Sequence, residues 1–250
     1  MTSPLRRLVA TELKLMGREP LTVLFVFVFP VVTMLIIGGS FGTTPTAGFD
    51  WVNPAHWYVA SYLTVVIAAT GLITVPVHLA AYRERGVLRR FAAAGFPRRS
   101  FAAAQMITGL VAVAIGSAVL LAVAAPVYGL PPARQVGLVA AAMVLGSVAF
   151  ISLGVLLGTV LPSARSAQAV GMLLFFPSFL LGAGGPPPQV MGSVLRNLSG
   201  YLPLTRVTDS VRDPWLGTGT GTGSLAVVAV ITVVATVLAV RRSTLTATTG

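Results

Sequence analysis

The chain has 250 residues, of which 55% are hydrophobic and only 9% are charged, and it contains no cysteine. A soluble domain carries about 25% charged residues, so this composition indicates a membrane protein and excludes a disulfide framework. The net charge of +11 would suggest nucleic-acid binding in a soluble protein, but here the basic residues lie between apolar stretches. Membrane topology therefore explains the charge without a nucleic-acid partner.

The N-terminal segment, residues 4–18, has the pattern of an amphipathic helix. At 100° per residue its leucines, Val9 and Met16 fall on one face and its four basic residues on the other. Such a helix is expected to lie in the membrane interface. Glu12 falls within the apolar face, and we expect it to pair with Arg83 or Arg85 from the next basic segment.

Six apolar stretches are long enough, at about 20 residues, to cross a bilayer. They are residues 21–39, 58–81, 102–129, 135–161, 167–184 and 224–240. The sequence therefore predicts an all-α integral membrane protein with six transmembrane helices, forming a single transmembrane domain over residues 1–250. The prolines within the spans are compatible with this fold because neighbouring helices can satisfy the freed carbonyls.

The distribution of basic residues predicts the orientation of the spans. Thirteen of the 17 Lys and Arg residues lie in the two terminal segments and in the second and fourth connectors. Cytoplasmic loops are the ones enriched in Lys and Arg. We therefore expect both termini to be cytoplasmic.

The second connector, residues 82–100, contains six arginines and a single acid, Glu84. Its apolar residues share one side of a helical wheel, so a short amphipathic cytoplasmic helix is expected, ending before Pro97. The arginines alone would be explained by topology and by binding of anionic lipid. Neither role requires Glu84, and Gly86, Leu88 and their neighbours could form a small apolar surface for a partner protein.

The outer segment, residues 185–223, lies between the fifth and sixth spans. Residues 189–198 and 205–212 have the pattern of two short apolar helices. They suggest a re-entrant pair that dips into the outer leaflet, and the alternative is an ordinary extracellular loop. The Gly-Thr repeat at 217–223 lacks the lysine of a phosphate-binding loop, so no nucleotide site is expected in this chain.

The stretch ERGVLRRFAAAGFP, residues 84–97, resembles the coupling segment of type 2 ABC transporter permeases of the daunorubicin-permease-like family. That segment follows the second span and reads E-x-G-x-L-x-x-L before a small residue and proline. Glu84, Gly86, Leu88 and Pro97 match this pattern, while Phe91 replaces the last leucine. The stretch Leu-Pro-Leu-Thr at residues 202–205 is also similar to the re-entrant element of these permeases.

The resemblance implies three sets of functional residues. Those expected to couple to an ATPase are Glu84, Gly86, Leu88, Arg89, Phe91 and Pro97. Those expected along a substrate pathway are Thr64, Thr70, Phe175, Phe176 and Phe179, although core packing explains the phenylalanines equally well. Those expected at an outer re-entrant gate are Gly184, Pro186, Leu202, Pro203 and Thr205.

The family also implies a function. The chain would be the permease subunit of an exporter in the bacterial inner membrane, not an enzyme. It would work with two copies of a separate ATPase subunit, which binds ATP and Mg²⁺, and with a second permease copy or a paralogue. The near absence of ionisable residues in the spans agrees with an external energy source. An amphipathic, drug-like or lipid-like substrate is expected, and the alternatives are a glycan permease or a non-transporting membrane anchor.

Overall fold

The computed structural model describes residues 4–87, 90 and 98–245, and these residues form helices and loops without a strand. In chain order the helices are α1 Pro4–Met16, α2 Pro20–Thr22, η1 Val23–Val28, α3 Phe29–Ser40, η2 Ala47–Phe49, α4 Pro54–Ala69, η3 Thr70–Thr74 and α5 Val75–Glu84. After the connector follow α7 Arg98–Tyr128, α8 Val136–Val160, α9 Ala164–Ser178, η4 Phe179–Ala183, η5 Pro188–Val190, α10 Ser193–Tyr201, α11 Pro203–Leu216 and α12 Thr222–Leu245.

The prediction of six spans is confirmed. Within the described part of the chain, six helical stretches are long and apolar enough to cross a membrane. They are Pro20–Ser40, Ala47–Glu84, Ala103–Tyr128, Val136–Val160, Ala164–Ala183 and Thr222–Arg242. The helix of the second span begins at Pro54, before the expected start, because the Asn53 side chain accepts a hydrogen bond from Ala55 N and Pro54 occupies the first turn.

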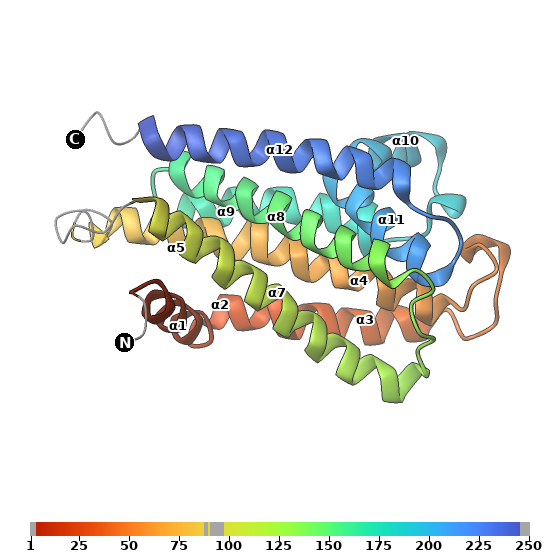
Figure 1. The fold of residues 1–250 in the computed structure, drawn as a ribbon. Coiled ribbons are helices and arrows are strands. Elements are labelled where there is room, and N and C mark those ends of the chain that lie inside the picture. Colours follow the sequence, from red (N-terminus) through yellow and green to blue (C-terminus); the bar gives the residue numbers. More distant parts are fainter. Residues whose placement is uncertain (1–3, 88–89, 91–97, 246–250) are drawn as a thin grey trace.

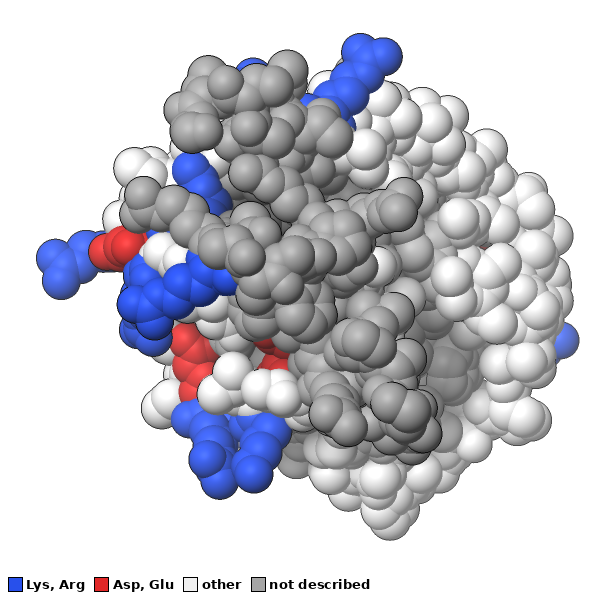
Figure 2. Space-filling model, turned by 60° about the vertical axis from the view of Figure 1, so that its left-hand side comes forward, with Lys and Arg blue, Asp and Glu red and all other residues white. Residues whose placement is uncertain are grey.

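The spans form one bundle whose two ends differ in charge. α1, the end of α5, the start of α7 and the end of α12 lie at the same end, on the left in Figure 1. Figure 2 turns this end toward the viewer and shows Lys and Arg side chains gathered on one side of it. We call it the basic end, defined by Lys14, Arg18, Arg83, Arg165 and Arg242. The opposite end carries η2, η5 and α10 (Figure 1).

The second span, formed by α4, η3 and α5, is the central helix of the bundle. Its whole apolar window is buried, whereas the other five spans bury less than half of theirs. It packs against α3, α7, α8, α9 and α11. Close approach depends on glycine: a Cβ on Gly154 of α8 would lie 2.2 Å from the Gly71 carbonyl oxygen, and one on Gly171 of α9 would lie 2.1 Å from the Leu72 carbonyl oxygen. Gly154 and Gly158 of the fourth span thus face the second span of the same chain.

Three spans contain a π-helical turn beside a proline. η1 precedes Pro30, η3 precedes Pro76, and η4 follows Pro177. Proline lacks an N–H and crowds the carbonyl four residues earlier. For Pro30 and Pro76 that carbonyl lies within the π-helical turn, whose wider backbone accommodates both effects. Since η1 and η3 pack together, two of these wide turns lie side by side near the basic end.

Candidate coupling site and transport pathway

The candidate coupling site begins where α5 ends. Gly86 has a φ of +68°, and its N–H donates to the Arg83 carbonyl oxygen at 3.1 Å. This left-handed conformation ends the helix and favours glycine over residues with a side chain. Of the predicted coupling residues the structure describes Glu84 and Gly86. Leu88, Arg89, Phe91 and Pro97 lie outside the described residues.

Arg83 and Glu84 contact the ends of two neighbouring helices. Arg83 Nη1 donates to the carbonyl oxygens of Gly158, at 2.9 Å, and Leu161, at 3.1 Å, at the C-terminus of α8. Glu84 Oε2 accepts from Ala164 N, the first amide of α9, at 3.1 Å. These carbonyls and this amide have no partner within their own helices, so the contacts match charge to each helix end.

Glu12 is buried between α1 and the two helices that flank the connector. Its Oε2 accepts from Tyr82 Oη of α5, at 3.1 Å, and from Gln105 Nε2 of α7, at 3.3 Å. The expected pairing with Arg83 or Arg85 is wrong, because Arg83 donates to backbone carbonyls of α8 and the neighbouring Tyr82 takes its place. Burial raises the pKa of the Glu12 carboxyl, while the two donated hydrogen bonds oppose that shift.

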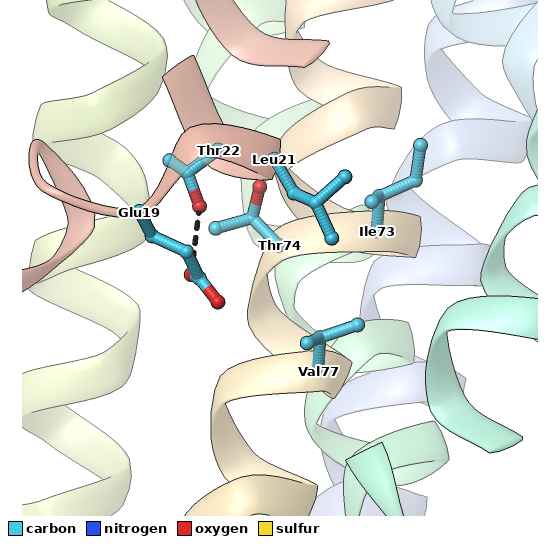
Figure 3. A pocket seen from close by; sticks show the side chains of 6 residues that line it. All are labelled: Glu19, Leu21, Thr22, Ile73, Thr74 and Val77. Atoms are coloured by element: carbon cyan, nitrogen blue, oxygen red, sulfur yellow. Dashed lines mark hydrogen bonds between the residues drawn. The ribbon is translucent and has the colours of Figure 1, made fainter. Parts of the chain in front are cut away.

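A second carboxylate joins the start of the first span to the second span. Glu19 Oε2 is hydrogen-bonded to His78 Nε2 and accepts from Thr22 Oγ1 at 3.1 Å. Figure 3 shows the side chains that line a crevice beside this contact. Those from the start of the first span are Glu19, Leu21 and Thr22, and those from the second span are Ile73, Thr74 and Val77. No pattern in the sequence indicated the contact between Glu19 and His78, because the two residues lie 59 positions apart in the chain.

The predicted pathway residues of the second span are buried in this single chain. Thr64 Oγ1 lies 2.8 Å from Thr208 Oγ1 of α11, so a hydroxyl pair joins α4 to α11. Thr70 Oγ1 donates to the Val66 carbonyl oxygen at 2.8 Å. Both hydroxyls thus have hydrogen-bond partners within the protein. The two threonines make separate contacts and do not form one site.

The predicted pathway residues of the fifth span form part of an aromatic cluster. Phe175 and Phe179 are stacked with ring centroids 5.9 Å apart, and Phe176 packs edge-on against Phe175. Phe25 and Phe29 of the first span join the same cluster. Phe175 and Phe179 are buried, whereas Phe176 keeps 39% of its surface exposed. The contribution of the first span was not foreseen, because a phenylalanine in an apolar run carries no signal of which neighbour it meets.

The predicted outer gate residues gather where the fifth span meets α11. Leu202 and Pro203 begin α11, and a Cβ on Gly182 would lie 3.1 Å from Thr205 Oγ1, so η4 runs directly past the start of α11. Position 184 has room only for glycine, because a Cβ there would lie 2.0 Å from the Phe179 ring. Pro186 is exposed at the opposite end of the bundle.

A buried arginine fixes α11 to the central helix. The Arg212 guanidinium lies 3.8 Å from the centre of the Trp57 ring of α4, and its Nη2 is 2.6 Å from Asp209 Oδ1. Asp213 lies on its other side, with Oδ1 3.5 Å from Arg212 Nε. Cation–π contact and two carboxylates together stabilise a cation that is otherwise costly to bury. In the sequence only the spacing of one arginine between two acids hinted at this cluster.

The described residues hold no group of three or more His, Cys, Asp or Glu side chains that could bind a metal ion. The polar groups described above contact helix ends, hydroxyls and aromatic rings. Their arrangement serves to hold helices together and to connect them, and it does not resemble a catalytic centre.

Comparison with known proteins agrees with this geometry. The model of the ABC-2 type transporter family matches residues 4–214. The probable multidrug ABC transporter permease YbhR of Escherichia coli strain K12 is 24% identical over 172 residues, and its counterpart in Escherichia coli O157:H7 gives the same values. The match covers 67% of this chain and 46% of each relative, so the chain spans about half the length of the curated relatives it matches. The chain is therefore a multi-pass membrane protein that belongs to the ABC-2 type transporter family.

Proposed function

We propose that this chain is the permease of an exporter that moves amphipathic, drug-like or lipid-like molecules outward, driven by a separate ATPase subunit that binds ATP and Mg²⁺. The observation that carries the proposal is the central second span. It is buried along its apolar length and continues from Pro54 to Glu84 directly into the arginine-rich connector. A protein that moved the connector would therefore act on the helix that touches most of the others.

The substrate class follows from what the helices offer. Aromatic and aliphatic side chains dominate the first, second and fifth spans. The hydroxyls of Thr64 and Thr70 are already hydrogen-bonded, and Tyr62 Oη and Thr74 Oγ1 are buried without a partner. Few polar groups remain to recognise the hydroxyls of a sugar polymer. The name of the relative from Escherichia coli, a probable multidrug permease, points to the same class of substrate.

A second permease copy would complete the pathway. The first and fifth spans present exposed apolar side chains on the side of the aromatic cluster, including Ile36, Leu173, Phe176 and Leu180. Two copies facing each other across these spans would enclose a pathway lined by apolar and aromatic groups, with the predicted residues of spans two and five behind it. Two ATPase copies would then serve the two connectors.

The basic end is proposed to be cytoplasmic, in a bacterial inner membrane, on the evidence of its positive charge. With this orientation α1 lies at the inner membrane interface and α10 and α11 form the re-entrant pair at the outer end. Support for the re-entrant placement comes from α10, whose Val194, Leu195 and Leu198 are 49% to 70% exposed in the chain alone. Such a surface suits lipid better than water.

The proposed partner is tested by affinity purification in a gentle detergent. We expect the tagged chain to co-purify a P-loop ATPase from its host, and we expect Leu88→Asp in the predicted docking surface to reduce its yield by about tenfold, because a buried charge costs more than 1.4 kcal/mol at an apolar contact. Mass spectrometry identifies and quantifies the co-purified subunit.

Thr218→Asp is the control, because it places the same charge at an exposed position of the loop before α12, at the opposite end. It should leave the ATPase yield unchanged. Absence of any P-loop ATPase with the unaltered chain would reject the exporter and favour a non-transporting anchor. Equal loss with both substitutions would reject docking at the connector.

A further inference from the structure

The last turn of α5 contacts three other elements through three consecutive residues. Tyr82 reaches α1 through Glu12, Arg83 reaches the end of α8, and Glu84 reaches the start of α9. Residues 83 and 84 thereby bracket the short loop that joins the fourth and fifth spans.

The charges of Arg83 and Glu84 match the two helix ends that these side chains contact. The positive guanidinium of Arg83 lies on the carbonyls at the negative end of the α8 dipole, and the carboxylate of Glu84 lies on the first amide at the positive end of the α9 dipole. Exchanging the two charges would set each against its helix end. The fit therefore identifies both helix ends as the intended partners of these two side chains.

The contact with the start of α9 also changes the role expected of Glu84. An acid at the start of a docking segment is expected to face the partner protein. Here the Glu84 carboxylate turns back onto its own chain, one residue before the connector leaves α5 through Arg85 and Gly86. The side chain lies where a displacement of the connector would first reach the rest of the bundle.

We propose that Arg83 and Glu84 form a link that carries displacement of the connector to the fourth and fifth spans, so that Glu84 is a positioning residue inside the permease and not a docking residue for the ATPase. The inference rests on the proposed function. It explains why the fifth span, which the connector does not join covalently, can follow the movement of the second span.

The test measures movement of the fifth span directly and requires no known substrate. The chain has no cysteine, so Leu180→Cys provides a single reactive thiol in η4, at a position that is 54% exposed in the chain alone. In the complex purified with its ATPase, we expect the rate of maleimide labelling to change by roughly threefold or more between the nucleotide-free state and the state trapped with Mg²⁺, ATP and vanadate.

Glu84→Ala in this background should abolish the change in labelling rate while leaving ATPase yield and basal ATP hydrolysis at the unaltered level. Glu84→Gln should retain the change, because its side-chain oxygen still accepts from Ala164 N. Arg165→Ala, an exposed neighbour of Ala164 in the first turn of α9, is the matched control and should behave as the unaltered chain.

Three outcomes would overturn the inference: loss of the ATPase with Glu84→Ala, failure of Glu84→Gln to retain the response, or a constant labelling rate at Leu180→Cys in the unaltered background. A chain that co-purifies no ATPase would instead reject the proposed function, and the inference with it. The contact itself is tested separately in membranes, where Glu84→Cys and Ala164→Cys should be joined by a short bifunctional maleimide, and Glu84→Cys with Thr218→Cys should not.

Discussion

At the scale of single residues, Glu12 shows how a buried acid can organise a membrane protein without an ion pair. Its side chain retains only 3% exposure, and its two donors come from the helices before and after the connector. Neutral donors of this kind stabilise a carboxylate less than a cation would, so the proton remains attached to higher pH. Protonation of Glu12 is therefore linked to the stability of the basic end.

The sign of this linkage gives a prediction. The pKa of the Glu12 carboxyl is raised by burial above its ordinary value of 4.5, so the folded chain holds a proton that the unfolded chain has released. The stabilisation this provides is complete below pH 4.5 and is lost as the pH rises through the raised pKa. Relative to Glu12→Gln, which stays neutral, the melting temperature of the unaltered chain should therefore fall between about pH 4 and about pH 8.

Thermal unfolding in detergent, followed by tryptophan fluorescence, measures the difference. Asp50→Asn is a suitable control, because Asp50 is exposed and its left-handed backbone tolerates asparagine. Its melting temperature should track that of the unaltered chain across the pH range. Parallel profiles for Glu12→Gln and the unaltered chain would contradict the linkage.

At the scale of helices, contact between α8 and the second span depends on glycine, which has no side chain. Gly154 lets the α8 backbone approach the Gly71 carbonyl to a distance at which no side chain fits. In a membrane, where lipid is as apolar as the helices, such close packing provides much of the force for association. We therefore expect this interface to tolerate no added methyl group.

Gly154→Ala should lower the free energy of unfolding by about 1–3 kcal/mol, the usual cost of overpacking, even though alanine favours a helix. Gly137→Ala in the same helix is the matched control. Nothing lies within 4 Å of its added Cβ, so this change should be neutral or stabilise by up to about 1 kcal/mol. Melting temperatures in detergent compare the two, and equal effects would show that the contact at Gly154 is looser than described.

The sequence predicted the number of helices and most of their ends, because the length of an apolar run and the residues that cap it are local properties. It did not predict which span is central. Val66 of the second span is fully buried and Val32 of the first is 45% exposed, yet the first span is the more apolar, with a mean hydropathy of 2.7 against 2.0 for the second. Apolarity does not mark the central span, since lipid-facing and protein-facing surfaces have similar polarity. For the same reason the phenylalanines of the fifth span could be named as candidates, but their contacts with Phe25 and Phe29 could not.

The candidate site shows a second limit of prediction from the sequence, which concerns the hydrogen-bond partners of the acids. Charge pattern singled out Glu12 and Glu84. It suggested an arginine partner for Glu12, because Coulomb attraction is the obvious way to satisfy an acid, and a contact with the ATPase for Glu84. The structure uses a tyrosine, a glutamine and a backbone amide instead. Hydrogen bonds from neutral groups depend on positions in space that are fixed only when the helices have packed.

At the scale of the whole molecule, the positive charge is distributed unequally between the two ends of the bundle. Thirteen of the 17 basic residues belong to segments at the basic end. This asymmetry predicts that the basic end faces the cytoplasm. Exposed single cysteines in a chain that has none can report the orientation.

We expect a membrane-impermeant maleimide to label Thr218→Cys, in the loop before α12, in cells whose inner membrane is intact. Arg242→Cys, at the other end of α12, should be labelled only after that membrane is permeabilised. Both positions are exposed in the structure, so access to the reagent depends on the side of the membrane alone. The reverse pattern would invert the topology and place the connector out of reach of any ATPase in the cytoplasm.

The burial of the second span also bears on how the lipid bilayer acts on this protein. A bilayer that is too thin or too thick presses on the helices that border it, which tilt or bend in response. The helix that leads into the connector is surrounded by protein, so changes in membrane thickness reach it only after its neighbours have absorbed part of the strain. An exporter built in this way would keep its coupling to ATP comparatively constant while the composition of the surrounding membrane changes.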